Sequence, residues 1–493
     1  MIKLTALLPR PWMVMAVIVS HFGIPAQTQA DAYPYLAEAE VAEDAAPDRQ
    51  PVILSKHKSW FGAFSDIHFD PFYDPSLVDK LAAAEPARWD SIFATSSITS
   101  PSAPGSDTNF PLFKSLLDAI SRQARRLDYL IVPGDFLAHD FREKFQSLAS
   151  DKSEVAYQRF VIKTMHYLAR SLKARFPTVP VIAALGNNDS FCGDYMIQPA
   201  GDFLYETSPL MTSLVMTGLA GDGRGFDAYP ELGAYVLPHP KTPNHYFVVF
   251  DDVFFSKNYR NRCGLSFIDP AQGLLLWLES TLYRMQRMGA EVTLVTHLPV
   301  GIDVYNSTKA CSTGEAPTSH LATAHEAAFL RILKRYPTLI ETIFVGHSHN
   351  DDFRVLAADD GRPFAFQRVV PSISPLHGNT PSYQVYQYDR STGTPLNTIT
   401  LAFDSGGGAG RSTWVREYDF KEAYGTDALT AESLHALVGK FTSDQTMRAR
   451  YSYYFTGGTK TGAITDANWP AYACGLTNID AAAFSACCRG RSP

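Results

Sequence analysis

The segment TIFVGHSH, from Thr342 to His349, joins an apolar run to two histidines that stand one residue apart. The run is short and rich in β-branched and aromatic residues, which is typical of a buried strand. In an extended chain, residues i and i+2 point to the same side, so both imidazoles can reach one bound group. Histidine is the commonest metal ligand among side chains. The segment predicts a strand whose carboxyl end carries metal ligands; a solvated loop that happens to contain two histidines is the alternative.

Further short apolar runs share this pattern, at residues 60–66, 127–135, 179–187, 245–255 and 291–297. Amphipathic stretches with helical periodicity, notably 153–176 and 271–289, separate several of them. Such alternation of strands and helices indicates an α/β fold with a largely parallel sheet. Strand-like stretches after about residue 360 would add antiparallel strands, and the chain from about Ala428 is predicted to be helical.

Polar side chains follow these runs, where each strand is expected to end: Asp66, His68, Asp135, Asn187, Asn188, His297, His347 and His349. Ligands of open α/β sheets bind outside the carboxyl ends of strands, so we expect these groups to meet at one edge. Asp, Asn and His together suit Zn, Mn or Fe better than Ca or Mg, which prefer oxygen ligands. Without Asn188, these residues are seven ligands, too many for one tetrahedral ion but a match for two ions that share a carboxylate. Two such ions can clamp the attacking and leaving oxygens of a phosphoryl displacement.

The order of these motifs, Asp-x-His, Gly-Asp, Gly-Asn-x-Asp, Thr-His and Gly-His-x-His, resembles the calcineurin-like metallophosphoesterase superfamily. Four stretches are similar to its acid sphingomyelinase-like phosphodiesterase branch: SDIHFDPFYD (65–74), GDFLAHD (134–140), THLPVG (296–301) and GHSHNDDFRV (346–355). The resemblance runs in order over roughly residues 58–490. It implies a sandwich of two mixed β-sheets flanked by helices, with a small C-terminal helical region.

The resemblance also implies a role for each ligand. The first metal would be held by Asp66, His68, Asp135 and His349, with Asp135 bridging to a second metal that Asn187, His297 and His347 complete. Each histidine of the GHSH motif would thus serve a different ion. The cofactors would be two divalent ions, Zn with Mn or Fe as alternatives. They would lower the pKa of a shared water, and the hydroxide would attack phosphorus in line.

Two further residues are catalytic candidates. His139, four residues after Asp135, matches a histidine that protonates the leaving group in this branch. Histidine as a residue type suits proton donation at mildly acidic pH, while a surface or helix-capping histidine is the alternative. Many relatives carry Gly-Asn-His-Asp or Gly-Asn-His-Glu, in which the histidine assists catalysis, whereas this chain has Asn188. An asparagine can hydrogen-bond a phosphoryl oxygen but cannot act as an acid, so proton donation is left to His139.

Some neighbouring residues receive lesser roles. Asp107 is predicted to cap a helix that begins near Pro111. Asp70 is predicted to orient a metal-bound histidine. His245 and His377 could reach the site, but we interpret both as structural or surface residues.

The N-terminus has the features of an export signal. Lys3 and Arg10 precede an apolar stretch at 12–24, and small residues follow it as far as Ala30. A membrane anchor is the alternative, but the stretch is shorter than the ~20 residues that a bilayer requires. We therefore predict a secreted or periplasmic protein without a transmembrane segment. The predicted organisation is a signal peptide (1–30), a flexible leader (31–55), a catalytic domain (56–425) and a C-terminal helical, disulfide-containing region (426–493).

The cysteines and the charge limit the class of protein. All six cysteines follow the signal, and cysteines of exported proteins usually pair. The resemblance implies a Cys474–Cys487 bond, in which Cys488 could replace Cys487; Cys263 could pair with Cys192 or Cys311. A formal net charge of -7, without any block of basic residues, excludes a nucleic-acid-coating role.

These observations predict a secreted dinuclear-metal phosphodiesterase that acts on soluble phosphoesters such as nucleotides. Sphingomyelinase, acid phosphomonoesterase and endopolyphosphatase are the alternative activities. A secreted metal-binding protein with a retired site is the non-enzymatic alternative, motivated by Asn188. Sphingomyelinases of this branch that work on membranes carry an N-terminal saposin-like domain. We expect no room for one before the first strand, which favours a soluble substrate.

Overall fold

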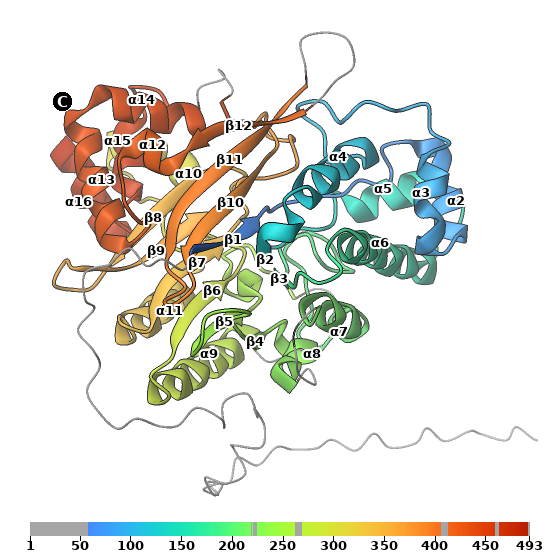
Figure 1. The fold of residues 1–493 in the computed structure, drawn as a ribbon, viewed down its shortest axis with the longest axis horizontal. Coiled ribbons are helices and arrows are strands. Elements are labelled where there is room, and N and C mark those ends of the chain that lie inside the picture. The colour runs from blue at the N-terminus through green and yellow to red at the C-terminus, as the bar shows by residue number, and fades with distance from the viewer. Residues whose placement is uncertain are drawn as a thin grey trace, which may run out of the picture. The chain divides into compact units, whose positions relative to one another are not determined.

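The computed structural model describes residues 58–491 except 218, 220–223, 262–268, 406–412 and 459–462. The signal peptide and leader predicted for residues 1–55 lie outside the described residues and stay predictions, as do the predicted domain boundaries. Two six-stranded β-sheets carry the fold (Figure 1).

Both sheets are mixed, as the resemblance predicted. The first has the order β12-β11-β10-β1-β2-β3, with bounds Thr413–Asp419, Pro395–Asp404, Ser382–Asp389, Lys58–Ala63, Leu127–Val132 and Val181–Ala183. The second has the order β4-β5-β6-β7-β9-β8, with bounds Tyr235–Pro238, His245–Val249, Glu291–Val295, Ile340–Val345, Pro363–Val369 and Asp352–Ala357. In the first sheet β1, β2 and β3 are parallel, and β10 joins β1 antiparallel. In the second, β5, β6, β7 and β9 are parallel, with β4 and β8 antiparallel at the two edges.

An aromatic cluster holds the two sheets face to face. The ring of Phe61 in β1 stacks between Tyr129 and Tyr386, with centroids 4.6 and 4.7 Å away. The same ring meets Phe344 of β7 edge-on at 5.8 Å, across the boundary between the sheets. All four side chains are buried. Stacked and edge-on pairs stabilise a core beyond their area burial, so this cluster fixes the spacing of the sheets from which the site loops emerge.

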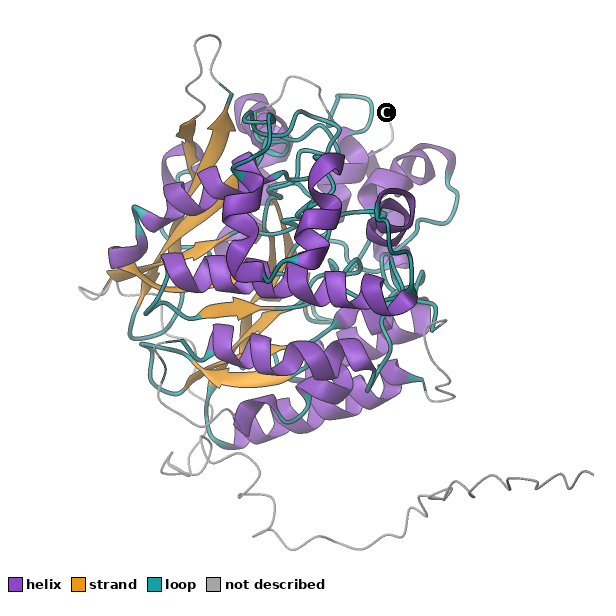
Figure 2. Cartoon of the chain, turned by 90° about the vertical axis from the view of Figure 1, so that its right-hand side faces the viewer, coloured by secondary structure: helices purple, strands orange, loops and turns teal. Residues whose placement is uncertain are grey.

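Helices flank the sheets (Figures 1 and 2). Their bounds are α2 Val78–Ala83, α3 Trp89–Phe93, α4 Phe110–Ser121, α5 Phe141–Leu148, α6 Glu154–Arg175, α7 Asp202–Val215, α8 Tyr229–Leu232, α9 Pro270–Arg287, α10 Val304–Thr313, α11 Thr323–Arg335, α12 Phe420–Tyr424, α13 Ala431–Ser443, α14 Gln445–Tyr454, α15 Trp469–Gly475 and α16 Ala481–Arg491. The C-terminal group from α12 to α16 begins directly after β12 and contacts β8 and β9 through α13. None of the described helices combines the length and the apolar character that crossing a membrane requires.

The strand predicted at 245–255 is shorter than expected. β5 ends at Val249, and Asp252–Phe255 forms a 3₁₀ helix, η6. The carboxylate of Asp251 accepts a hydrogen bond from the backbone of Val253, which caps η6 and turns the chain. A continuous apolar run does not distinguish a buried strand from a short buried helix, which explains the error.

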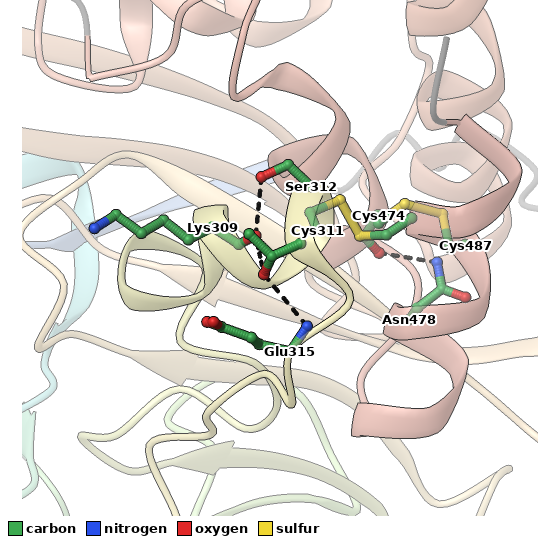
Figure 3. Close-up of a disulfide and its surroundings, with 9 residues drawn as sticks. Lys309, Cys311, Ser312, Glu315, Cys474, Asn478 and Cys487 are labelled. Carbon is green, nitrogen blue, oxygen red and sulfur yellow. Dashed lines mark hydrogen bonds between the residues drawn. A yellow bond between two sulfur atoms is a disulfide. The ribbon is translucent and has the colours of Figure 1, made fainter.

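Two disulfides tie the C-terminal helices together. Cys474 of α15 bonds Cys487 of α16, as the resemblance implied, and Cys311 of α10 bonds Cys488 (Figure 3). The alternatives in which Cys488 replaces Cys487, or Cys311 takes another partner, are therefore wrong. Cys192 is also disulfide-bonded. Cys263, its predicted partner, lies outside the described residues, so that pairing stays a prediction. Because Cys487 and Cys488 are adjacent, α16 is attached covalently to both α10 and α15.

We expect these two disulfides to contribute unequally to stability. The Cys311–Cys488 bond spans 177 residues and the Cys474–Cys487 bond spans 13. Loop-closure entropy then favours the longer crosslink by about 2 kcal/mol in the free energy of unfolding. Differential scanning calorimetry should show a larger fall in melting temperature for Cys311→Ala/Cys488→Ala than for Cys474→Ala/Cys487→Ala. An equal or smaller fall would contradict this explanation.

Candidate metal centre

The predicted ligands lie in loops that begin where β1, β2, β3, β6 and β7 end. Each of these strands ends two to four residues before its first ligand, so the strands end earlier than predicted. Five of these residues have a positive φ: Asp66 (50°), His68 (41°), Asp135 (55°), His347 (68°) and His349 (62°). The two histidines of the GHSH motif are therefore not in an extended chain, and the extended geometry predicted for them is wrong.

A left-handed backbone is uncommon outside glycine and costs about 1–3 kcal/mol per residue. Such strain persists only where the surrounding structure imposes it. In the loops after β1, β2 and β7 it turns the ligand side chains toward one another. Close approach of the backbone adds a second constraint: a Cβ on Gly346 would lie 2.1 Å from Ser65 Oγ and 2.5 Å from Asp66 Oδ2.

Four side chains form a first donor group. His68 Nε2 lies 3.1 Å from His349 Nε2, 3.4 Å from Asp135 Oδ2 and 3.8 Å from Asp66 Oδ1. His349 Nε2 lies 3.5 Å from Asp66 Oδ1. All four side chains are buried. Neighbouring ligands of one ion, each ~2.0–2.2 Å from it, have separations of this size.

Four side chains likewise form a second donor group. His297 Nε2 and His347 Nδ1 each lie 2.9 Å from Asn187 Oδ1. His297 Nε2 is also 3.3 Å from Asp135 Oδ2. One carboxylate oxygen, Asp135 Oδ2, thus faces His68 in the first group and His297 in the second.

The ring tautomers of two histidines are fixed by backbone carbonyls. His68 Nδ1–H donates to Leu137 O at 3.0 Å, and His297 Nδ1–H donates to Pro133 O at 2.7 Å. In the neutral form of both rings the lone pair is then on Nε2, the atom that faces the other donors. Such carbonyl acceptors orient metal-binding imidazoles in known sites. His349 Nδ1 is buried and has no hydrogen-bond partner among the described residues.

The charge of the pocket attracts cations. Burial opposes ionisation of Asp66, but His349 and a hydrogen bond from His68 outweigh it and lower its pKa to about 2. For His68 and His297, burial favours the neutral ring, but the negative charge of Asp135 outweighs burial. The pKa of His68 is raised to about 9 and that of His297 to about 10. The buried carboxylates therefore need positive charge beside them, which a proton or a metal ion can supply. Together with the donor types, this fits two divalent ions.

Two aspartates that the sequence did not single out hold the loops in place. Asp189 accepts hydrogen bonds from the backbone N–H groups of Phe136 (2.9 Å), Leu137 (3.1 Å) and Gly186 (2.9 Å), joining two ligand loops. Asp252 accepts from the backbone of His297 at 3.1 Å. Both are buried. The sequence signal that could have identified them is their position directly after an apolar run, Asp189 in GNND and Asp252 in FDD.

Asn188 contacts the shared carboxylate. Its backbone N–H donates to Asp135 Oδ1 at 2.8 Å, and its side-chain amide donates to Asp135 Oδ2 at 3.1 Å. In this arrangement the amide of Asn188 orients Asp135.

His139 lies against the first donor group. Its ring stacks on His68 with centroids 3.9 Å apart, and 29% of its side chain is exposed. Its Nδ1–H donates to Asp107 Oδ1 at 3.0 Å, which leaves Nε2 for another contact. The capping role predicted for Asp107 is therefore wrong, because Asn109 caps α4 by accepting from Leu112 N.

The other lesser predictions have mixed outcomes. Asp70 Oδ2 pairs with Lys144 Nζ at 2.9 Å and not with a histidine, so its predicted role is wrong. His245 is a structural residue that hydrogen-bonds Thr293 Oγ1 at 2.9 Å. The exposed ring of His377 lies 4.6 Å from the ring of His349, at the edge of the pocket.

Metal analysis of ligand variants tests this geometry. We expect the wild-type chain, saturated with Zn²⁺ and then gel-filtered, to retain two ions. Asn187→Ala should retain one, because only the second donor group loses an atom. Asp135→Ala should lose both, because both groups share Asp135 Oδ2. The control is Asn244→Ala, an exposed asparagine outside the pocket. Two ions in Asp135→Ala, measured by plasma mass spectrometry, would contradict the shared oxygen.

Two family models match this chain, and several named proteins are similar to it. The family model described as calcineurin-like phosphoesterase matches residues 59–351, and that of the acid sphingomyelin phosphodiesterase C-terminal region matches residues 364–492. Human acid sphingomyelinase-like phosphodiesterase 3b is 24% identical, covering 87% of this chain and 89% of that protein. Mouse cyclic GMP-AMP phosphodiesterase SMPDL3A is 25% identical, covering 90% and 93%. Sphingomyelin phosphodiesterase 2 of Caenorhabditis elegans is 24% identical, covering 72% of this chain and 53% of that protein.

The first of these models spans more than half of the chain and includes every predicted ligand. The second covers the antiparallel strands and the disulfide-linked helices that follow. The chain therefore belongs to the calcineurin-like phosphoesterase family of hydrolases, in its acid sphingomyelinase-like branch.

Proposed function

We propose that the protein is a dinuclear-metal phosphodiesterase that acts on soluble phosphoesters such as nucleotides. The observation that carries this proposal is the position of Asp135 Oδ2, which lies 3.4 Å from His68 Nε2 and 3.3 Å from His297 Nε2. One oxygen between two donor groups is what a pair of bridged ions requires.

Two divalent ions, Zn with Mn or Fe as alternatives, are the proposed cofactors. The first would be held by Asp66, His68, Asp135 and His349, and the second by Asp135, Asn187, His297 and His347. When bound, such ions lower the pKa of a water and stabilise negative charge on phosphoryl oxygens. The chain's contribution is to hold these donors rigidly in a buried pocket.

His139 is the proposed proton donor to the leaving oxygen. Asp107 holds Nδ1–H of this ring and also accepts from its backbone N–H at 2.9 Å, so the ring cannot rotate freely. Lys144 Nζ fixes Asp107 in turn, at 3.3 Å from Oδ2. The proton would therefore leave from Nε2, the nitrogen that Asp107 does not engage. Asn188 would orient Asp135 and would not donate a proton.

The names of two relatives suggest different substrates. Cyclic GMP-AMP phosphodiesterase supports a nucleotide substrate. Sphingomyelin phosphodiesterase 2 and the matched C-terminal region favour sphingomyelin as a second candidate. A secreted or periplasmic location is supported by the cysteines, because every one in the described residues is disulfide-bonded.

Ester preference tests the proposed activity. We expect hydrolysis of bis-p-nitrophenyl phosphate to exceed that of p-nitrophenyl phosphate, and a chelator to abolish both. Added Zn²⁺ or Mn²⁺ should restore turnover. A faster monoester reaction would reject the diesterase, and turnover that survives chelation would reject the metal-dependent mechanism. A cyclic dinucleotide and micellar sphingomyelin, compared by kcat/KM, then separate the two substrate classes.

His139→Ala should lower kcat about 10²–10⁴-fold for a diester with a poor leaving group, because general acid catalysis is lost. For a p-nitrophenyl ester the loss should be smaller, since that leaving group needs little protonation. Metal content should stay at two ions. The matched control is His435→Ala, an exposed histidine on α13, which should not alter either rate. An unchanged rate for poor leaving groups would show that the proton comes from another residue.

A further inference from the structure

Two consecutive residues behind the second donor group have no assigned role. Asp194 and Tyr195 follow Asn187 in the same loop, and each contacts one donor from the side that faces away from the others. We propose that this pair, the 194–195 clasp, positions Asn187 and His347 for the second metal ion. The inference rests on the proposed function, because it concerns the same site.

Asp194 determines which atom of Asn187 enters the pocket. Asn187 Nδ2–H donates to Asp194 Oδ1 at 2.6 Å. A carboxamide has one oxygen and one nitrogen, so holding the nitrogen on one side directs the oxygen to the other. Asn187 Oδ1 accordingly lies 2.9 Å from both His297 Nε2 and His347 Nδ1. A metal ligand must present this oxygen, since the amide nitrogen is only a donor.

Tyr195 determines which ring nitrogen of His347 faces the other donors. The Tyr195 hydroxyl lies 3.1 Å from His347 Nε2. If Nε2–H donates to this hydroxyl, the lone pair of the neutral ring is on Nδ1, the atom that faces Asn187 Oδ1. For His68 and His297 a backbone carbonyl has this role. His347 uses a side chain instead, and its ring is turned so that Nδ1 points inward.

The backbone of the loop supports the clasp. Tyr195 has a φ of 56°, which is rare for an aromatic residue and persists only where the surrounding structure imposes it. Its N–H donates to Asn187 O at 2.9 Å, and its carbonyl accepts from Arg260 N at 3.0 Å. The first of these bonds brings the loop back to Asn187, the residue whose side chain Asp194 holds. A tyrosine that merely filled space would not need this conformation.

Metal affinity separates positioning from a general role in folding. The probe is Zn²⁺ alone, added to the metal-free full-length chain in competition with a chromophoric chelator. We expect two sites in the wild type. Tyr195→Phe and Asp194→Ala should each weaken one site 10–100-fold, which is typical when a partner of a ligand is lost, and leave the other site unchanged.

Two further variants act as controls. Asp194→Asn keeps an oxygen that can accept from Asn187, so it should recover most of the affinity lost in Asp194→Ala. Tyr259→Phe removes a hydroxyl that donates to Ile197 O at 3.0 Å, in the same region but away from the donors. This variant should bind both ions as the wild type does. Circular dichroism melts identify any variant that fails to fold.

The possible outcomes are distinct. Unchanged affinity at both sites in Tyr195→Phe and Asp194→Ala would overturn the clasp while leaving the proposed function intact. Equal weakening of both sites would also overturn it, because the residues would then act through the fold. A wild-type chain that binds fewer than two ions would overturn the proposed function, and the clasp with it.

Discussion

The carboxylate of Asp135 lies between two sets of imidazoles, and the rest of the site is arranged around it. Asp135 and Asp66 are almost completely buried, which is costly for an anion unless positive charge and hydrogen bonds compensate. The chain meets this requirement with imidazoles in contact and with backbone donors: the N–H of His347 reaches the Asp66 carboxylate at 3.0 Å. Protons on His68 and His297 balance the charge when no cation is present, and cations take that place when they bind.

Holding these groups together requires a rigid support, because several ligand loops have strained backbones. The support comes from two sheets locked by the aromatic cluster around Phe61. Two buried carboxylates fix the loops to this support. Asp189 joins the loops after β2 and β3, and Asp252 holds the loop after β6. The stable core thus holds the ligand loops in their strained backbone conformations, as is common at functional sites.

The sequence predicted the sheets, the family and the membership of the pocket, because apolar runs and the polar residues after them are local patterns. Other features depended on contacts between distant residues. Asp107 reads as a helix cap from its neighbours, yet it binds His139, which is 32 positions away. The left-handed turns at His347 and His349 could not be inferred from an apolar run, so the extended geometry assumed for them was wrong. Asp251 ended a strand early through a single side-chain hydrogen bond that periodicity does not register.

The pairing of two ions across one carboxylate oxygen can be seen directly by anomalous X-ray diffraction from crystals grown with Zn²⁺, with data collected on both sides of the zinc absorption edge. We expect two anomalous peaks about 3.5–4 Å apart, both within ligand distance of the Asp135 carboxylate. A single peak, or two peaks of which one lies out of reach of Asp135, would contradict it.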